Sequence, residues 1–195
     1  MTWIILLLIV LAVVAVSLYN RLVTARNAYG NAFAQIDVQL TRRHDLVPNL
    51  VEVAKRYIQH ERETLEAVIA ARAAAVDGLR NAAANVSDPA ALQQLAASEN
   101  TLAGALGRLL AVVEAYPDLK ADRTMAQLSE EVTSTENKVA FARQAYNDQV
   151  MTYNNARESF PGNLIAGYFN FSPAQLLQIE SATKREVPKI TFDQA

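Results

Sequence analysis

The N-terminal stretch carries no charged side chain before Arg21, and residues 4–18 form an almost unbroken apolar run. A helix from Trp3 to Tyr19 would be about 25 Å long, the short end of what crosses a hydrocarbon core. The two terminal aromatics favour the membrane interface, and Arg21 can reach lipid headgroups. We therefore predict a transmembrane anchor over residues 1–20. The residues assigned to it are Trp3, Ile4, Leu8, Leu11, Leu18, Tyr19 and Arg21.

A cleaved signal peptide is the alternative interpretation of this run. No Lys or Arg precedes it, it is long for the apolar part of a signal peptide, and Ala15-Val16-Ser17 is a weak cleavage site. An anchor is therefore favoured.

The orientation of the anchor follows from its flanking basic residues. Arg21 and Arg26 follow the run, whereas only the α-amine lies before it. The positive-inside rule then places the N-terminus outside and the remainder in the cytoplasm. We expect a single-pass membrane protein whose bundle lies in the cytoplasm.

Composition narrows the class of the remaining chain. About 175 of the 195 residues follow the anchor, which is enough for one domain. A net charge of −2 argues against a nucleic-acid partner. The absence of cysteine excludes a disulfide framework and a cysteine-based zinc site, and it suits a reducing compartment. With only 6 glycines and 6 prolines, the sequence is typical of an all-α fold.

Apolar residues recur at spacings of three and four, which is the period of amphipathic helices. We predict helices over residues 21–46, 48–84, 89–116 and 122–159. Pro48 lacks an amide N–H and is expected to kink or break the first helix, whereas Pro89 suits a helix start. Three to four long helices within residues 21–160 predict an antiparallel up-and-down bundle.

The tail, residues 161–195, is rich in aromatic side chains. A short helix is expected to start at Ser172-Pro173, and the end of the chain is expected to be extended. We predict that this tail packs on the bundle or on a partner. The residues assigned to tail docking are Phe160, Tyr168, Phe169, Phe171 and Phe192.

No constellation in the sequence indicates catalysis. His60-Glu61 begins like a zinc-protease motif but lacks the second histidine. His44 and His60 lack the Glu-x-x-His spacing of a di-iron bundle, and no glycine-rich phosphate loop is present. The spacing of the carboxylates is typical of a solvent-exposed helix face, although Glu99 interrupts an apolar stripe. We expect no catalytic residue, metal, cofactor or small-molecule substrate.

Two helical segments are rich in amide and basic side chains. They are either solvent-exposed faces, a polar network between helices that fixes register, or a surface for self-assembly. The sequence leaves these readings open. The candidate residues are Arg26, Asn27, Asn31, Asp37, Arg43, Asn137, Arg143, Asn147 and Asn154.

The chain resembles the bacterial LemA family in blocks that follow one another over nearly its whole length. They include Gln35-Ile36-Asp37-Val38-Gln39-Leu40, Pro48-Asn49-Leu50-Val51, Thr135-Glu136-Asn137-Lys138, Phe141-Ala142-Arg143-Gln144, Tyr146-Asn147-Asp148 and Tyr153-Asn154. Phe169-Asn170-Phe171 departs from the Phe-Gly-Phe of the family. The resemblance implies a single-pass membrane protein with a helical bundle, carries no catalytic residues, and suggests membrane organisation through magnetosome-associated members.

The leading hypothesis is a non-enzymatic, membrane-anchored helical bundle that acts as a scaffold or self-assembles into homo-oligomers to organise a membrane. The alternative is an accessory subunit that binds a membrane protease or another membrane enzyme. The two differ in the partner that they predict, either a second copy or a different membrane protein.

Overall fold

The computed structural model describes residues 1–58 and 60–179. In this part of the chain all regular structure is helical, which confirms the predicted all-α fold. The helices are α1 (Thr2–Lys55), α2 (Arg62–Ala84), α3 (Pro89–Ala115), α4 (Pro117–Ala121), α5 (Arg123–Glu158) and α6 (Gly162–Tyr168).

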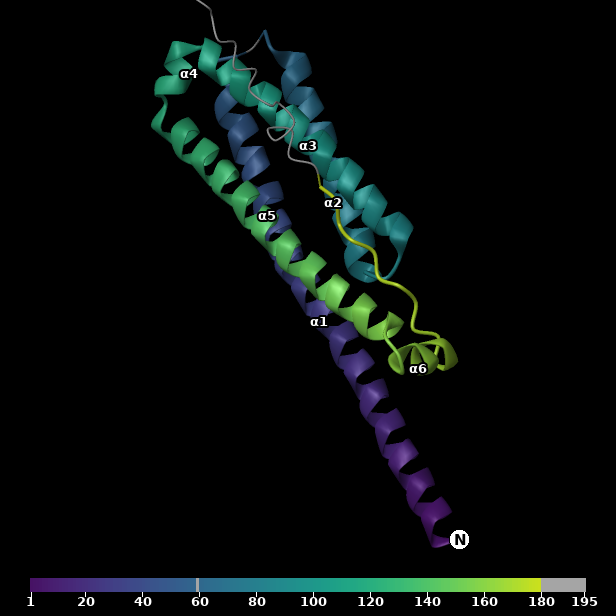
Figure 1. Cartoon of the computed structure of the whole chain (residues 1–195). Helices are drawn as coiled ribbons and strands as arrows, with labels where there is room; N and C mark the ends of the chain where they lie inside the picture. Colours follow the sequence, from purple (N-terminus) through teal and green to yellow (C-terminus); the bar gives the residue numbers. More distant parts are fainter. Residues whose placement is uncertain (59, 180–195) are drawn as a thin grey trace, which may run out of the picture.

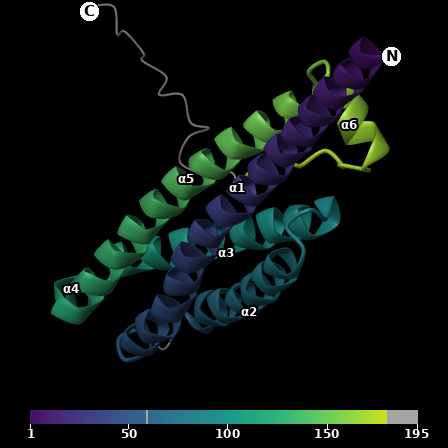
Figure 2. The same cartoon turned by 90° about the horizontal axis from the view of Figure 1, so that it is seen from below.

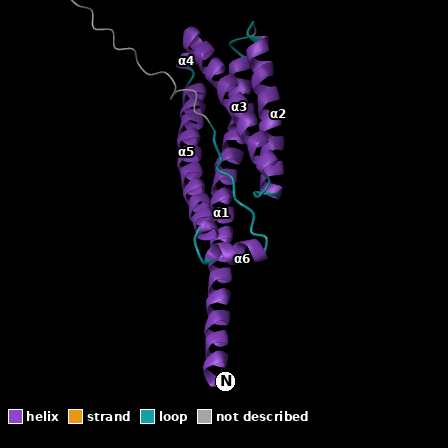
Figure 3. Cartoon of the chain, turned by 45° about the vertical axis from the view of Figure 1, so that its right-hand side comes forward, coloured by secondary structure: helices purple, strands orange, loops and turns teal. Residues whose placement is uncertain are grey.

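The bundle is built from two antiparallel helix pairs. Helices α1 and α5 lie side by side, and the α2–α3 hairpin packs against them (Figures 1 and 2). The first turns of α1 project alone from one end of the bundle. Residues 169 and 170 form a turn after α6, and the extended segment 171–179 then runs back between α5 and α3 (Figure 3).

The projecting part of α1 is the predicted anchor. Its most apolar window has a mean hydropathy of 2.7, and none of that window is buried against the protein. Among the described residues, α1 is the one helix long and apolar enough to cross a membrane. The same helix continues without interruption into the bundle, so the anchor and the first bundle helix form one rod.

Of the kink or break predicted at Pro48, the break is wrong. Helix α1 runs through Pro48 and ends at Lys55, and α2 begins only at Arg62. Proline cannot donate to the carbonyl four residues earlier, which here belongs to His44. The Nε of Arg72 on α2 donates to that carbonyl at 2.6 Å. A tertiary contact thus satisfies the group that proline leaves unpaired, and the helix continues.

Local signals account for the starts of the later helices. The Asp88 carboxylate accepts from the amide of Ala90, and Pro89 occupies the first helical position. The Asp122 carboxylate accepts from the amide of Met125 at the start of α5. This hydrogen bond is the main reason why the pKa of Asp122 is lowered.

The predicted short helix at Ser172-Pro173 is also wrong, because residues 171–179 are extended. A short helix lies earlier, as α6, and the chain turns at Asn170 with a φ of 54°. This left-handed conformation suits glycine and is tolerated by asparagine. Asparagine is therefore compatible with this turn, at a position where the sequence resemblance led us to expect glycine.

The core consists of two hydrophobic clusters stacked along the bundle. Leu40, Leu95 and Val139 belong to the cluster nearer the anchor. Val47, Leu102 and Val132 belong to the other. In each of α1, α3 and α5 the two clusters are therefore joined by one heptad, two turns of helix. What lies between them is polar.

Candidate functional site

A buried polar layer separates the two hydrophobic clusters. A terminal nitrogen of Arg43 donates to Glu99 Oε2, and His44 Nε2 lies 2.7 Å from Glu99 Oε1. The Glu99 side chain is fully buried, and those of Arg43 and His44 are 3% exposed. Helices α1 and α3 are thus joined by a charged contact that excludes water.

The arrangement of the polar layer favours a role in fixing the register of α3 against α1 over a role in catalysis. A buried carboxylate is costly unless both of its oxygens are paired, so Glu99 tolerates only a position that meets both partners on α1. Thr135, from α5, is also buried and donates to its own helix at the Val132 carbonyl. Arg43 Nε is buried without a hydrogen-bond partner among the described residues.

The described residues offer no candidate metal site. Over residues 1–58 and 60–179, no group of three or more histidine, cysteine or acidic side chains is placed to hold an ion. The layer itself offers one histidine and one carboxylate, and the carboxylate is already engaged by arginine.

A second polar constellation holds the extended segment on α5. The side-chain amide of Asn154 donates to the carbonyl of Ala174 and accepts from its amide, at 2.9 and 3.0 Å. Asn147 does the same with Leu177, at 3.2 and 2.9 Å. Each asparagine therefore satisfies both main-chain groups of one residue, as a neighbouring strand would.

We call this extended segment, residues 171–179, the strap. Three further side chains of α5 donate hydrogen bonds to it. The hydroxyls of Tyr153 and Tyr146 donate to the carbonyls of Ser172 and Gln175, at 2.8 and 3.0 Å. Arg157 Nε donates to the carbonyl of Phe171 at 3.0 Å. Burial raises the pKa of both tyrosine hydroxyls, so they remain neutral donors.

The spacing of the strap follows from helix geometry. The Tyr-Asn pair repeats after seven residues, about 10.5 Å along α5. Its partners repeat after three residues of extended chain, which is about 10 Å. The two repeats match, so one helix face can bind successive carbonyls of the segment. Phe171, Ala174 and Leu177 are buried at the same three-residue period.

The predicted amide-rich candidates therefore occupy different places. Arg43 is buried in the polar layer, and Asn147 and Asn154 hold the strap. Arg26 is exposed, with its guanidinium 5.4 Å from the Phe171 ring. Asp37 and Arg143 are half-buried. Three others, Asn27, Asn31 and Asn137, are exposed.

One exposed face of α1 has a regular pattern. Seven positions separated alternately by three and four residues are all exposed, and the first six carry no charge. We call this set the α1 stripe. It consists of Thr24, Asn27, Asn31, Ala34, Val38, Thr41 and Asp45.

Comparison with known proteins identifies the family of this chain. The LemA family pattern matches residues 32–192, most of the chain. The chain belongs to the LemA family.

Its curated relatives are magnetosome proteins. MamQ 1 and MamQ 2 of Paramagnetospirillum magneticum are each 32% identical over 88 residues, which cover 45% of this LemA chain and 32% of the relative. MamQ of Magnetospirillum gryphiswaldense is 24% identical over 80% of the chain and 66% of the relative. The matches thus span between about a third and two thirds of those proteins.

The residues predicted to dock the tail of this LemA chain also occupy different environments, some buried and some exposed. Phe171 is buried against the bundle, whereas Phe160, Tyr168 and Phe169 are exposed. The ring of Phe169 nevertheless contacts that of Tyr19, at 4.8 Å between centroids. Phe192 lies outside the described residues.

Sequence reasoning missed Glu99, Tyr146 and Tyr153 as functional candidates. Glu99 carried a signal, because a carboxylate interrupting an apolar stripe needs a buried partner. The repeated Tyr-Asn pair also carried one, since a seven-residue spacing places both pairs on one helix face. No local sequence pattern indicated which segment of the chain binds to this face of α5.

Proposed function

We propose that this LemA protein is a non-enzymatic membrane-anchored scaffold that self-associates through the α1 stripe. The observation that carries the proposal is the alternating three- and four-residue spacing of seven exposed positions. This spacing is the inner-position pattern of a coiled coil. A solvated helix face has no reason to keep six successive inner positions uncharged.

The chemistry of the α1 stripe fits a helix interface of modest stability. Val38 is 58% exposed and can be buried by a second helix. Asn27 and Asn31 occupy positions at which buried asparagine sets register and oligomeric state. Gly30, beside the stripe, has no atom within 4 Å of where a Cβ would stand. This open space allows close approach of another helix.

The anchor supplies the geometry for pairing. Because the α1 helices of all copies leave the membrane in the same direction, two stripes meet in parallel and in register. The same spacing continues back through Asn20, Ser17 and Val13 toward the lipid-embedded part. Confinement to a surface also raises the effective concentration of copies, which favours a weak interface.

The proposal places the bundle at the cytoplasmic face of a bacterial inner membrane, with the N-terminus outside. The flanking arginines support this orientation. The magnetosome relatives are compatible with a role in organising a membrane, and a scaffold requires no catalytic group. No observation favours the accessory-subunit alternative.

Cross-linking of the full-length protein in native membranes tests the proposal. We would introduce single cysteines at Asn31 and Val38 in the α1 stripe, and at Ala70 on the exposed face of α2 as a control. The chain has no cysteine of its own, so the background is clean. A short thiol cross-linker should join copies at the stripe and not at Ala70.

Four outcomes contradict parts of the proposal. Equal cross-linking at Ala70 would indicate random collision, and the absence of any stripe cross-link would exclude the interface. Adducts with a different protein would favour the accessory-subunit alternative. Labelling of the Ala70 variant by a membrane-impermeant thiol reagent in intact cells would overturn the orientation.

A further inference from the structure

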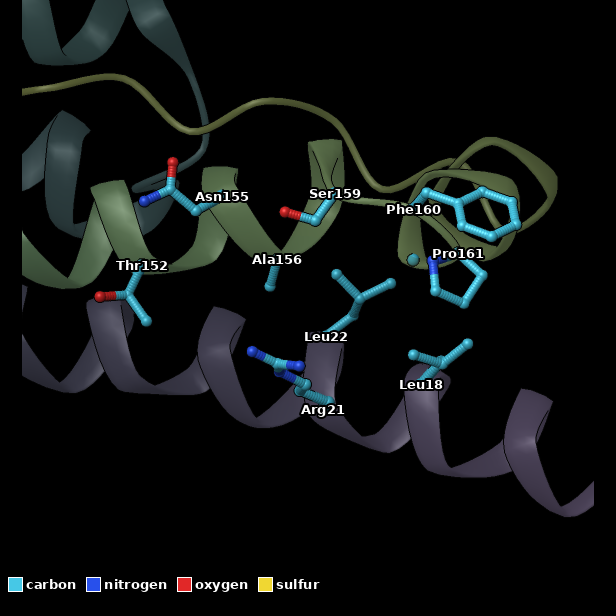
Figure 4. A pocket seen from close by; sticks show the side chains of 10 residues that line it. Leu18, Arg21, Leu22, Thr152, Asn155, Ala156, Ser159, Phe160 and Pro161 are labelled. Carbon is cyan, nitrogen blue, oxygen red and sulfur yellow. The ribbon is translucent and has the colours of Figure 1, made fainter.

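Helix α6 lies at the membrane-proximal end of the bundle. The ring of Tyr19, the last residue of the predicted span, contacts those of Phe169 and Phe171, at 4.8 and 5.7 Å. Leu18 and Arg21 of α1 line a pocket together with Phe160 and Pro161, which precede α6 (Figure 4). The end of the bundle is therefore fixed at the level where α1 becomes apolar.

No other described turn reaches that level. The α2–α3 turn meets α1 at Tyr29, whose hydroxyl lies 3.2 Å from that of Ser87. Tyr29 is ten residues beyond Tyr19, about 15 Å further along the helix. In Figure 1, α6 lies beside α1 where the helix leaves the bundle. If residues 3–19 span the hydrocarbon core, α6 stands at the headgroups.

The surface of this end carries a cluster of large exposed apolar and aromatic side chains. Phe160 is 80% exposed, Leu164 63%, Tyr168 82% and Phe169 51%. Leu164 and Tyr168 are one turn apart and share a helix face. No charged residue occurs from Ser159 to Ile179. A cluster of this kind on one end of a protein marks a contact surface.

We propose that these four residues form a lipid-contacting foot that rests in the bilayer interface beside the anchor. The foot consists of Phe160, Leu164, Tyr168 and Phe169. Tyrosine and other aromatics prefer the headgroup level, where a ring is buried and a hydroxyl stays hydrated. Arg21 and Arg26 are exposed on the neighbouring turns of α1, where they can meet lipid phosphates.

Two points of attachment have a mechanical consequence. A single helix can tilt and rotate in a bilayer, since its length alone sets no angle. A foot beside the anchor fixes the tilt and rotation of α1. The inference rests on the membrane anchor but goes beyond self-association, because it assigns a surface to lipid and holds equally for a monomer.

Fluorescence quenching by labelled lipids tests the foot. Full-length protein with a single bimane-labelled cysteine at Leu164 or Tyr168 would be placed in phosphatidylcholine–phosphatidylglycerol vesicles. One set of vesicles would carry phosphatidylcholine with a nitroxide near the top of its acyl chain, and a second set would carry the nitroxide near the end of the chain. Val10→Cys in the span is the positive control, and Asp77→Cys on α2 is the negative control.

We expect quenching at Leu164 and Tyr168 by the shallow nitroxide to approach that at Val10 by the deep nitroxide, and to exceed that at Asp77 several-fold. Quenching no greater than at Asp77 would overturn the foot. Protection from both lipid nitroxide and a water-soluble quencher would also overturn it, because a protein surface would then cover the site. Loss of quenching at Val10 as well would contradict the anchor itself, which separates the two failures.

A charge substitution gives a second readout. Tyr168→Asp lies on an exposed position and should leave helix content unchanged, whereas it should reduce quenching at Leu164. The control Asn163→Asp adds the same charge on exposed α6 outside the foot. Equal effects of the two variants would contradict the assignment of residues to the foot.

Discussion

Arg72 Nε on α2 donates a hydrogen bond to the main-chain carbonyl of His44 on α1, at 2.6 Å. Pro48 has no N–H for this carbonyl. The contact therefore fixes α2 to α1 at the residue whose side chain also meets Glu99. A side chain from another helix thus pairs the carbonyl that Pro48 leaves without its helical donor.

The first prediction tests this dependence with a double-mutant cycle. Arg72→Met should lower the free energy of unfolding by about 1–3 kcal/mol, because a partly buried carbonyl loses its donor. In a Pro48→Ala background the loss should be smaller, since alanine supplies the helical N–H. Thermal unfolding of full-length protein in detergent measures both. Equal losses in the two backgrounds would show that the two residues are not coupled.

The second prediction concerns the polar layer. Glu99→Leu should destabilise the bundle by about 3–5 kcal/mol, because it leaves the Arg43 charge buried and unpaired. Adding Arg43→Met should recover much of this loss, since both charges are then absent. Chemical denaturation followed by circular dichroism compares the variants. A double variant less stable than Glu99→Leu alone would contradict this account of the layer.

Part of this architecture was readable from sequence, because the relevant signals are local. The anchor, α3 and α5 follow from apolar spacing and from caps such as Asp88 and Pro89. The passage of α1 through Pro48 was not readable, since its compensating donor lies on another helix. The extended segment was missed for a similar reason, because its main-chain partners are side chains of α5. In the sequence, Glu99 interrupts an apolar stripe, but nothing nearby in the chain indicates the partners of its carboxylate.

The third prediction concerns the strap. Asn154→Ala removes both hydrogen bonds to Ala174, whereas Asn155→Ala changes an exposed neighbour and serves as the matched control. Because alanine favours helix, neither change should weaken α5 itself. Hydrogen exchange of residues 171–179 should accelerate in Asn154→Ala only. Unchanged exchange would show that the segment is held mainly by its buried apolar side chains.

The fourth prediction concerns alkaline pH. Burial raises the pKa of Tyr146 and Tyr153 above the ordinary value of 10.0. Their contribution to stability is complete below about 10, and it declines above that pH because the unfolded chain ionises first. Tyrosinate absorbance should lose one late-titrating group in each of Tyr146→Phe and Tyr153→Phe. Titration of both groups at the ordinary value would contradict their burial.

The central claim is that two copies pair along α1. Full-length protein carrying one spin label at Asn31 or Val38, in bilayers, tests it through the distance between labels on different copies. Parallel, in-register helices have axes about 10 Å apart, so both positions should give short and similar distances, unlike Ala70 on α2. Only the long, broad distances of randomly placed copies, at Asn31 and Val38 alike, would contradict a scaffold built on the α1 stripe.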